Sequence, residues 1–156
     1  MNVKLRRRGM TLLELVMVVT LMGIIAAIGT ARFGRSAFAN FGAQGEARGI
    51  SLSMLRAQRA AIKTGDNHFL QFDAVSPNAA SQYSVMSRAG GGTTLVEGPF
   101  VFGTDVQVLA SAAEMDFNFE GEAAAAYQVD FTGEGRNWRI TVVPITGAVN
   151  VAEVSP

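Results

Sequence analysis

The chain has 156 residues, of which 49% are hydrophobic and 17% are charged, and its formal net charge is zero. This composition can supply one hydrophobic core with an N-terminal appendage, and it argues against a disordered chain. The chain contains no cysteine, which excludes disulfide bonds, thiolate metal sites and cysteine nucleophiles.

The zero net charge conceals a separation of charge along the chain. The first eight residues are basic and contain no acid. Residues 15–63 contain six basic residues against a single acid, Glu46. Residues 64–156 contain eleven acids against three arginines, a net charge of −8. A nucleic-acid partner is therefore not expected for the C-terminal part, because its charge would repel phosphate groups.

The N-terminus combines a basic cluster with a long apolar run, Leu15–Ile28, which only Thr20 interrupts. One interpretation is a secretory signal peptide cleaved near residues 27–31. A second is a membrane anchor, because the segment 10–31 would form a helix of about 33 Å, enough to cross a bilayer. The basic residues before the run favour a cytoplasmic N-terminus. These residues are Lys4, Arg6, Arg7 and Arg8.

Neither interpretation explains Glu14, since a carboxylate at the centre of a bilayer costs about 2.5–3.5 kcal/mol. The segment G-M-T-L-L-E-L, residues 9–15, resembles the processing site of type IV prepilins and type II secretion pseudopilins, G-F-T-L-x-E. The resemblance implies that a prepilin peptidase cleaves after Gly9 and that Met10 becomes an N-methylated mature N-terminus. Residues 1–9 would then be the leader peptide and residues 10–31 the apolar transmembrane and assembly helix.

Cleavage after Gly9 would place a free ammonium group at Met10, four residues before Glu14. When such helices bundle, the carboxylate of one subunit can pair with the terminal amine of its neighbour. A buried charge is tolerated when it is paired, and pairing fixes the register of otherwise featureless apolar helices. We therefore expect Glu14 to act in assembly.

Residues 32–65 are predicted to form an amphipathic stalk helix, with a possible interruption near residues 40–45 because of its glycines. Its apolar face is predicted to centre on Leu52, Leu55 and Ile62, with Ile50, Met54, Ala57 and Ala61 beside them. Gly65 is expected to end the helix.

Residues 66–156 change to short segments with alternating hydrophobicity, which predict β-strands. The expected strands are 68–72, 82–86, 94–97, 100–102, 105–109, 115–119, 127–131 and 138–142. Glycines 90–92 are expected to form a mobile loop and residues 133–135 a hairpin turn. The predicted fold is α+β, a long N-terminal helix packed on an antiparallel β-sandwich head.

Two further stretches of sequence resemble a particular group within this family. The helix end L-R-A-Q-R-A-A-I-K-T-G, residues 55–65, and the tail from residue 129 to 151 resemble GspH/FimT-type pseudopilins. The resemblance implies a minor pseudopilin of a type II secretion system, anchored in the bacterial inner membrane with a periplasmic head and assembled into the pseudopilus. Its partners would be prepilin peptidase, other pseudopilins or pilins, and the inner-membrane assembly platform. The alternative is a FimT-like minor type IV pilin that acts in pilus assembly or DNA uptake.

The sequence gives little support for DNA binding, metal binding or catalysis. FimT-like members are thought to bind DNA through G-R-x-R, but residues 147–150 read G-A-V-N. The stretch 116–127 departs from the calcium-loop pattern at its fifth and twelfth positions. His68 is expected at a strand start on the surface. We therefore expect no enzymatic activity, no cofactor and no metal site.

Overall fold

The computed structural model describes residues 12–155, with the backbone alone for residues 28–41. Residues 1–35 and 36–156 form two compact units. A helix, α1, covers Leu12–Thr64 in 53 residues, without the interruption that its glycines suggested. Its end is as predicted, because Gly65 has φ +81° and its N–H donates to the Ala61 carbonyl oxygen at 2.9 Å.

The buried stripe of the stalk helix includes Ile50, Met54, Ala57 and Ala61, as predicted, but the predicted centre of the face is wrong. Leu52 and Ile62 are each 55% exposed, whereas the residues on the opposite side of the helix are fully buried or nearly so. Small side chains let a helix backbone approach a sheet closely, so alanines rather than leucines mark the buried face here. The buried stripe consists of Ala43, Ala47, Ile50, Met54, Ala57 and Ala61.

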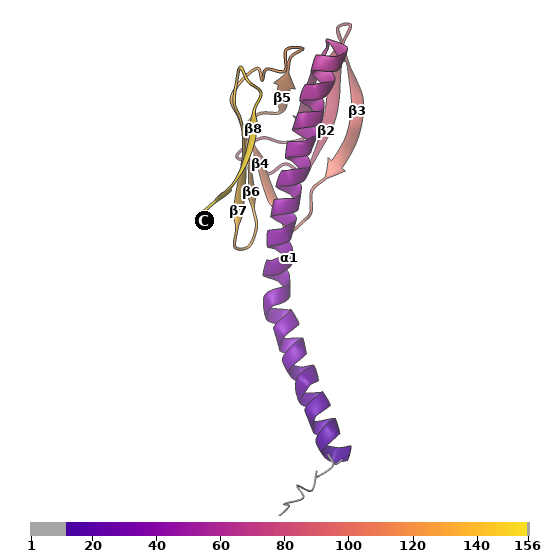
Figure 1. Ribbon diagram of the computed structural model, residues 1–156, viewed down its shortest axis with the longest axis vertical. Coiled ribbons are helices and arrows are strands. Elements are labelled where there is room, and N and C mark those ends of the chain that lie inside the picture. The colour runs from indigo at the N-terminus through magenta and orange to yellow at the C-terminus, as the bar shows by residue number, and fades with distance from the viewer. Residues whose placement is uncertain (1–11, 156) are drawn as a thin grey trace, which may run out of the picture. The chain divides into compact units, whose positions relative to one another are not determined.

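Eight antiparallel strands form two four-stranded sheets (Figure 1). The first sheet has the order β3 (Gly92–Val101), β2 (Gln82–Ala89), β1 (Asn67–Phe72), β5 (Glu114–Phe117). The second has the order β4 (Gln107–Ala110), β6 (Tyr127–Thr132), β7 (Asn137–Val142), β8 (Val149–Val154). The predicted α+β architecture, a helix packed on antiparallel sheets, is confirmed.

Glycine-containing turns make two of the hairpin connections in the head. Gly90 and Gly91, both with positive φ, form a tight two-residue turn in the β2–β3 hairpin, where a mobile loop was expected. The predicted hairpin at residues 133–135 is confirmed, because the Gly133 N–H donates to the Arg136 carbonyl oxygen at 3.2 Å.

One hydrophobic core joins the buried stripe of α1 to the inner faces of both sheets, which flank the helix (Figure 1). Its largest fully buried members include Phe117, Phe131, Met115 and Ile140. His68 is also buried, at 5% exposure, so its predicted surface position is wrong. Within the described residues, no helix combines the length and the hydropathy needed to cross a membrane.

Candidate functional site

The predicted processing site lies outside the described residues. This applies to the basic leader residues Lys4, Arg6, Arg7 and Arg8, to Gly9, and to Met10.

Glu14 lies in the first turn of α1. The residues that follow are apolar as far as Val19, so Glu14 is the single charged side chain at the start of an apolar helix.

The side chains of the apolar part of α1, residues 12–25, are exposed on all sides of the helix. Eleven consecutive or nearly consecutive large side chains are exposed, and the exposed fraction reaches 80% for Leu12. A helix that is hydrophobic all round is normally surrounded by other apolar groups, and soluble proteins rarely expose such a surface. The residues are Leu12, Leu13, Leu15, Val16, Met17, Val18, Val19, Leu21, Met22, Ile24 and Ile25.

Thr20 carries the hydroxyl group of this apolar segment, and the helix itself satisfies it. Its Oγ1 donates to the carbonyl oxygens of Val16 at 3.0 Å and Met17 at 2.9 Å. Such bonding to the preceding turn allows a threonine to enter an apolar environment without an unsatisfied donor. The whole side-chain surface from Leu15 to Ile25 is thus suited to contact with lipid or with other apolar helices.

At the other end of α1, Gln58 ties the helix to two loops of the head. Its Nε2 donates to the Gly121 carbonyl oxygen at 2.7 Å and lies 3.3 Å from that of Gly147 and 3.4 Å from that of Thr146. The loops join β5 to β6 and β7 to β8. Sequence reasoning missed this role, although Gln58 lies in the helix-end motif and Gly147 in the tail motif.

Both glycines of this junction have positive φ, and at Gly147 the space beside the backbone also requires glycine. A Cβ atom at Gly147, which has φ +61°, would overlap the Gly121 carbonyl oxygen and Gln58 Nε2. A Cβ atom at Gly121, with φ +83°, would lie 2.8 Å from Ile62 Cδ1. The two family-like motifs at residues 55–65 and 129–151 therefore meet in one structural contact.

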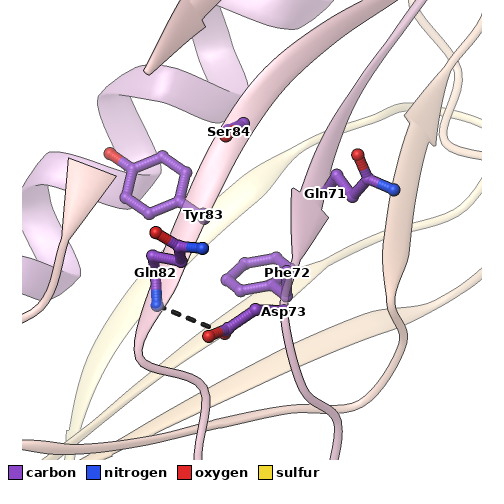
Figure 2. Close-up of a pocket in the computed structure, with 6 residues that line it drawn as sticks. All are labelled: Gln71, Phe72, Asp73, Gln82, Tyr83 and Ser84. Atoms are coloured by element: carbon purple, nitrogen blue, oxygen red, sulfur yellow. Dashed lines mark hydrogen bonds between the residues drawn. The ribbon is translucent and has the colours of Figure 1, made fainter. Parts of the chain in front are cut away.

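A shallow pocket of about 330 Å³ opens where β1 ends and β2 begins (Figure 2). Asp73 is held there by the Ser81 hydroxyl, the Ser81 N–H at 2.9 Å and the Gln82 N–H at 3.2 Å. Desolvation would raise the pKa of Asp73, but these hydrogen bonds outweigh it and lower the pKa below its ordinary value. The carboxylate is thus already engaged in closing a turn.

Tyr83 lines the same pocket, but its hydroxyl group points toward α1 (Figure 2). The hydroxyl lies 3.1 Å from the Ser53 hydroxyl in the interior, and burial raises the pKa of Tyr83. Its ring stacks on Phe100 and Phe102 with centroids 5.1 and 5.5 Å away. These contacts join β2, β3 and the helix, so Tyr83 serves packing rather than chemistry.

The arginines of the acidic head are neutralised. Arg88 reaches across β1 to Glu114 at 2.7 Å and Asp116 at 2.9 Å, and its guanidinium covers the buried Phe69 ring at 4.5 Å. Arg136 lies 3.5 Å from Glu153 and Arg139 lies 2.6 Å from Asp130, while Trp138 packs on the core. The residues 136–139 therefore form no free basic surface for phosphate groups.

The stretch that resembles a calcium loop is closed by its own hydrogen bonds. Asn118 Oδ1 accepts from the N–H groups of Glu120 at 3.0 Å and Glu122 at 2.9 Å, and Asn118 Nδ2 donates to the Glu122 carboxylate. Among the side chains that the structure describes, no group of three or more histidines and acids is placed to hold a metal ion.

Comparisons with known proteins agree with these features. Residues 4–30 match the family model of the prokaryotic N-terminal methylation motif. A search of curated protein sequences gave no match.

Solved structures share the fold at low sequence identity. The minor pseudopilin EpsH from the type 2 secretion system of Vibrio cholerae is 15% identical, with a TM-score of 0.58 over 71% of this chain and 96% of EpsH. A second EpsH structure is 13% identical, with a TM-score of 0.55 over 73% of this chain and 96% of EpsH. The type IV minor pilin FimU of Pseudomonas aeruginosa is 12% identical, with a TM-score of 0.53 over 70% of this chain and 87% of FimU. The chain thus combines an N-terminal methylation motif with the fold of minor pseudopilins and minor pilins.

Proposed function

We propose that the chain is a minor pseudopilin that prepilin peptidase processes and that assembles into the periplasmic pseudopilus of a type II secretion system. One observation carries the proposal: a helical segment that exposes apolar side chains on all sides lies within the methylation-motif match, residues 4–30, of a chain that has a pilin-like head. The role is structural, and we assign the chain no catalytic activity.

Processing would occur after Gly9, leaving Met10 as the mature N-terminus with an N-methyl group. The ammonium of one subunit would then pair with Glu14 of its neighbour inside the bundle of apolar helices. The pair removes the cost of burying either charge alone and sets the axial register between subunits. The first-turn position of Glu14 in α1 supports this role, because it lies close to the proposed new N-terminus.

Before assembly, the segment 10–31 would hold the protein in the bacterial inner membrane with the head in the periplasm. The apolar surface of α1 and the basic residues 4–8 support this orientation. The proposed partners are prepilin peptidase, the other pseudopilins or pilins that share the helical bundle, and the inner-membrane assembly platform.

The alternative is a FimT-like minor type IV pilin, and the similarity to FimU favours it. A role in pilus assembly would use the same helix. A role in DNA uptake has less support, because residues 147–150 lack arginine and the described arginines of the head pair with acids. A gel-shift assay with duplex DNA at physiological salt separates the DNA-binding role from the others.

The mass of the mature protein tests the processing step. We expect purified full-length protein to begin at Met10, carrying one added methyl group. A Gly9→Leu variant should retain residues 1–9, because the motif of the family places glycine before the cleaved bond. A wild-type N-terminus near Thr30 would instead identify a signal peptide, and retention of Met1 would identify a plain anchor; either result would refute the proposal.

A further inference from the structure

Within the described residues, β3, β5, β4 and β8 are the edge strands of the two sheets, and the chain itself covers two of these edges. The Ala80 N–H donates to the Val108 carbonyl oxygen at 2.8 Å on the free side of β4. The Ala124 N–H donates to the Asp116 carbonyl oxygen at 3.2 Å on the free side of β5. These contacts occupy backbone groups that could otherwise pair with another chain.

The edge of β8 is protected by its composition. Its exposed side chains, Asn150, Ala152 and Glu153, are small, polar or charged. Glu153 also lies 3.5 Å from Arg136. Polar and charged side chains on an edge strand disfavour pairing with a foreign strand.

The edge of β3 is long and apolar. All ten residues of this strand, Gly92–Val101, are exposed. Leu95 is 56% exposed and Val96 is 47% exposed, and residues 92–96 carry no charge. An exposed apolar edge strand is a template on which another strand can pair, so β3 is the candidate for a binding edge.

The register of the β2–β3 hairpin shows which backbone groups of β3 face away from β2. Residues 90 and 91 form a two-residue turn in which both φ angles are positive, and Ala89 pairs with Gly92 across it. The pair that flanks such a turn is hydrogen-bonded, and hydrogen-bonded pairs then alternate with non-hydrogen-bonded pairs. The N–H and C=O groups of Thr93 and Leu95 therefore point away from β2, toward the free edge.

β3 is already held as a strand by its neighbours in the head. It pairs with β2, and its Phe100 ring stacks on Tyr83 with centroids 5.1 Å apart. Its Glu97 lies 3.7 Å from Arg56 of α1. Binding to a strand that is already ordered costs less conformational entropy. The usable edge ends near residue 96, because register shifts follow there and Pro99 has no N–H.

We propose that residues 92–96 of β3 bind an extended segment of a different protein, which adds to the first sheet as a further strand. The backbone groups of Thr93 and Leu95 hydrogen-bond the segment, so the affinity comes mainly from main-chain pairing. Its side chains lie beside Leu95 on one face of the sheet and beside Thr94 on the other. The partner is an uncharged segment of about five residues, rich in apolar and β-branched side chains.

The charge of the head distinguishes this partner from two others. Residues 64–156 carry a net charge of −8, which repels the phosphate groups of a nucleic acid and also the head of a second copy. The binding edge belongs to the head alone. Its pairing therefore goes beyond the proposed pseudopilus function and does not depend on cleavage after Gly9 or on the apolar segment of α1.

Amide hydrogen exchange of the full chain in mild detergent, followed residue by residue by NMR, tests the pairing. The probe is a capped peptide that alternates valine and threonine between two lysines, K-V-T-V-T-V-K. At 1 mM probe we expect exchange of the Thr93 and Leu95 amides to slow about tenfold, which corresponds to a dissociation constant of about 0.1 mM. The Thr94 amide, which already bonds to β2, should be almost unchanged.

A control peptide of the same length and charge, K-V-T-P-T-V-K, separates main-chain pairing from attraction of lysine to the acidic head. Its central proline lacks an N–H, so it should not slow exchange at Thr93 or Leu95. Equal slowing by both peptides, or no slowing by the first, would overturn the proposal.

Two substitutions at one position provide the second measurement. Thr93→Pro removes an outward N–H without removing a bond to β2, and proline is tolerated on an edge strand. It should reduce the slowing at Leu95 roughly fivefold, while the Thr94 amide stays protected and so shows that β3 is intact. Thr93→Val keeps the N–H and is the matched control, which should respond like the wild type. Full slowing in Thr93→Pro would refute the main-chain pairing.

The same amides reveal a second copy as the competing occupant. In the absence of peptide, their exchange should not change with protein concentration. Slowing that grows with protein concentration and is lost in Thr93→Pro would assign the edge to self-association and overturn the proposal.

Discussion

Replacing Gly147 with alanine would test the contact between α1 and the two loops that Gln58 holds. The φ of +61° disfavours alanine by about 1–2 kcal/mol. The new Cβ would also push the loop away from the Gly121 carbonyl and Gln58 Nε2, leaving part-buried polar groups poorly paired at a cost of about 1–3 kcal/mol. We expect the free energy of unfolding to fall by about 2–5 kcal/mol and Tm by roughly 10 °C.

Near-ultraviolet circular dichroism during heating of the full chain in mild detergent would measure this change. Gly45→Ala is a matched control, because nothing lies within 4 Å of a Cβ atom at Gly45, which is exposed in the middle of α1. This control should raise stability by about 1 kcal/mol, since alanine is the better helix former. Equal melting temperatures for Gly147→Ala and wild type would show that the loops are not held as the structure indicates.

Two further predictions concern carboxylates. Glu14→Ala should leave membrane insertion intact but lower the amount of protein in the sheared filament fraction roughly tenfold, because the ammonium group of the neighbouring subunit loses its partner. Leu15→Ala is the control. Normal incorporation of Glu14→Ala into filaments would argue against charge pairing. Asp73→Asn should lower Tm at neutral pH, and the difference from wild type should disappear as the pH falls below the folded-state pKa of Asp73. The sign follows from that pKa, which folding lowers from 3.8, so that the stabilisation is present above 3.8 and is lost below the folded-state pKa.

The sequence predicted β1 to β7, because the signal of a strand is local, but it divided β3 into two strands, 94–97 and 100–102, and did not predict β8. Alternation of large apolar and polar residues marks each strand, and Met115 and Phe117 are indeed buried while Asp116 between them is partly exposed. The sequence did not predict which strands pair in each of the two sheets. It depends on contacts between segments far apart in the chain, such as β1 with β5, which no local pattern specifies.

The centre of the buried face of the stalk helix was predicted wrongly for a physical reason, although Ile50, Met54, Ala57 and Ala61 beside it are buried as predicted. Large side chains such as Leu52 and Ile62 have the stronger hydrophobic signal, but a helix shared by two sheets needs a narrow contact surface, which alanines provide. Gln58 was missed because a polar residue in a helix gives no sign of its partners. Only the fold brings the carbonyl groups of Gly121 and Gly147 within its reach.

The order in which the chain visits its two sheets has a consequence for how the head comes apart. The chain leaves the first sheet after β3, enters the second at β4, returns for β5 and leaves again for β6. Neither sheet is a continuous piece of sequence, so neither can form as a separate module. We expect the head to unfold in a single transition, because neither sheet stays folded once the other has unfolded.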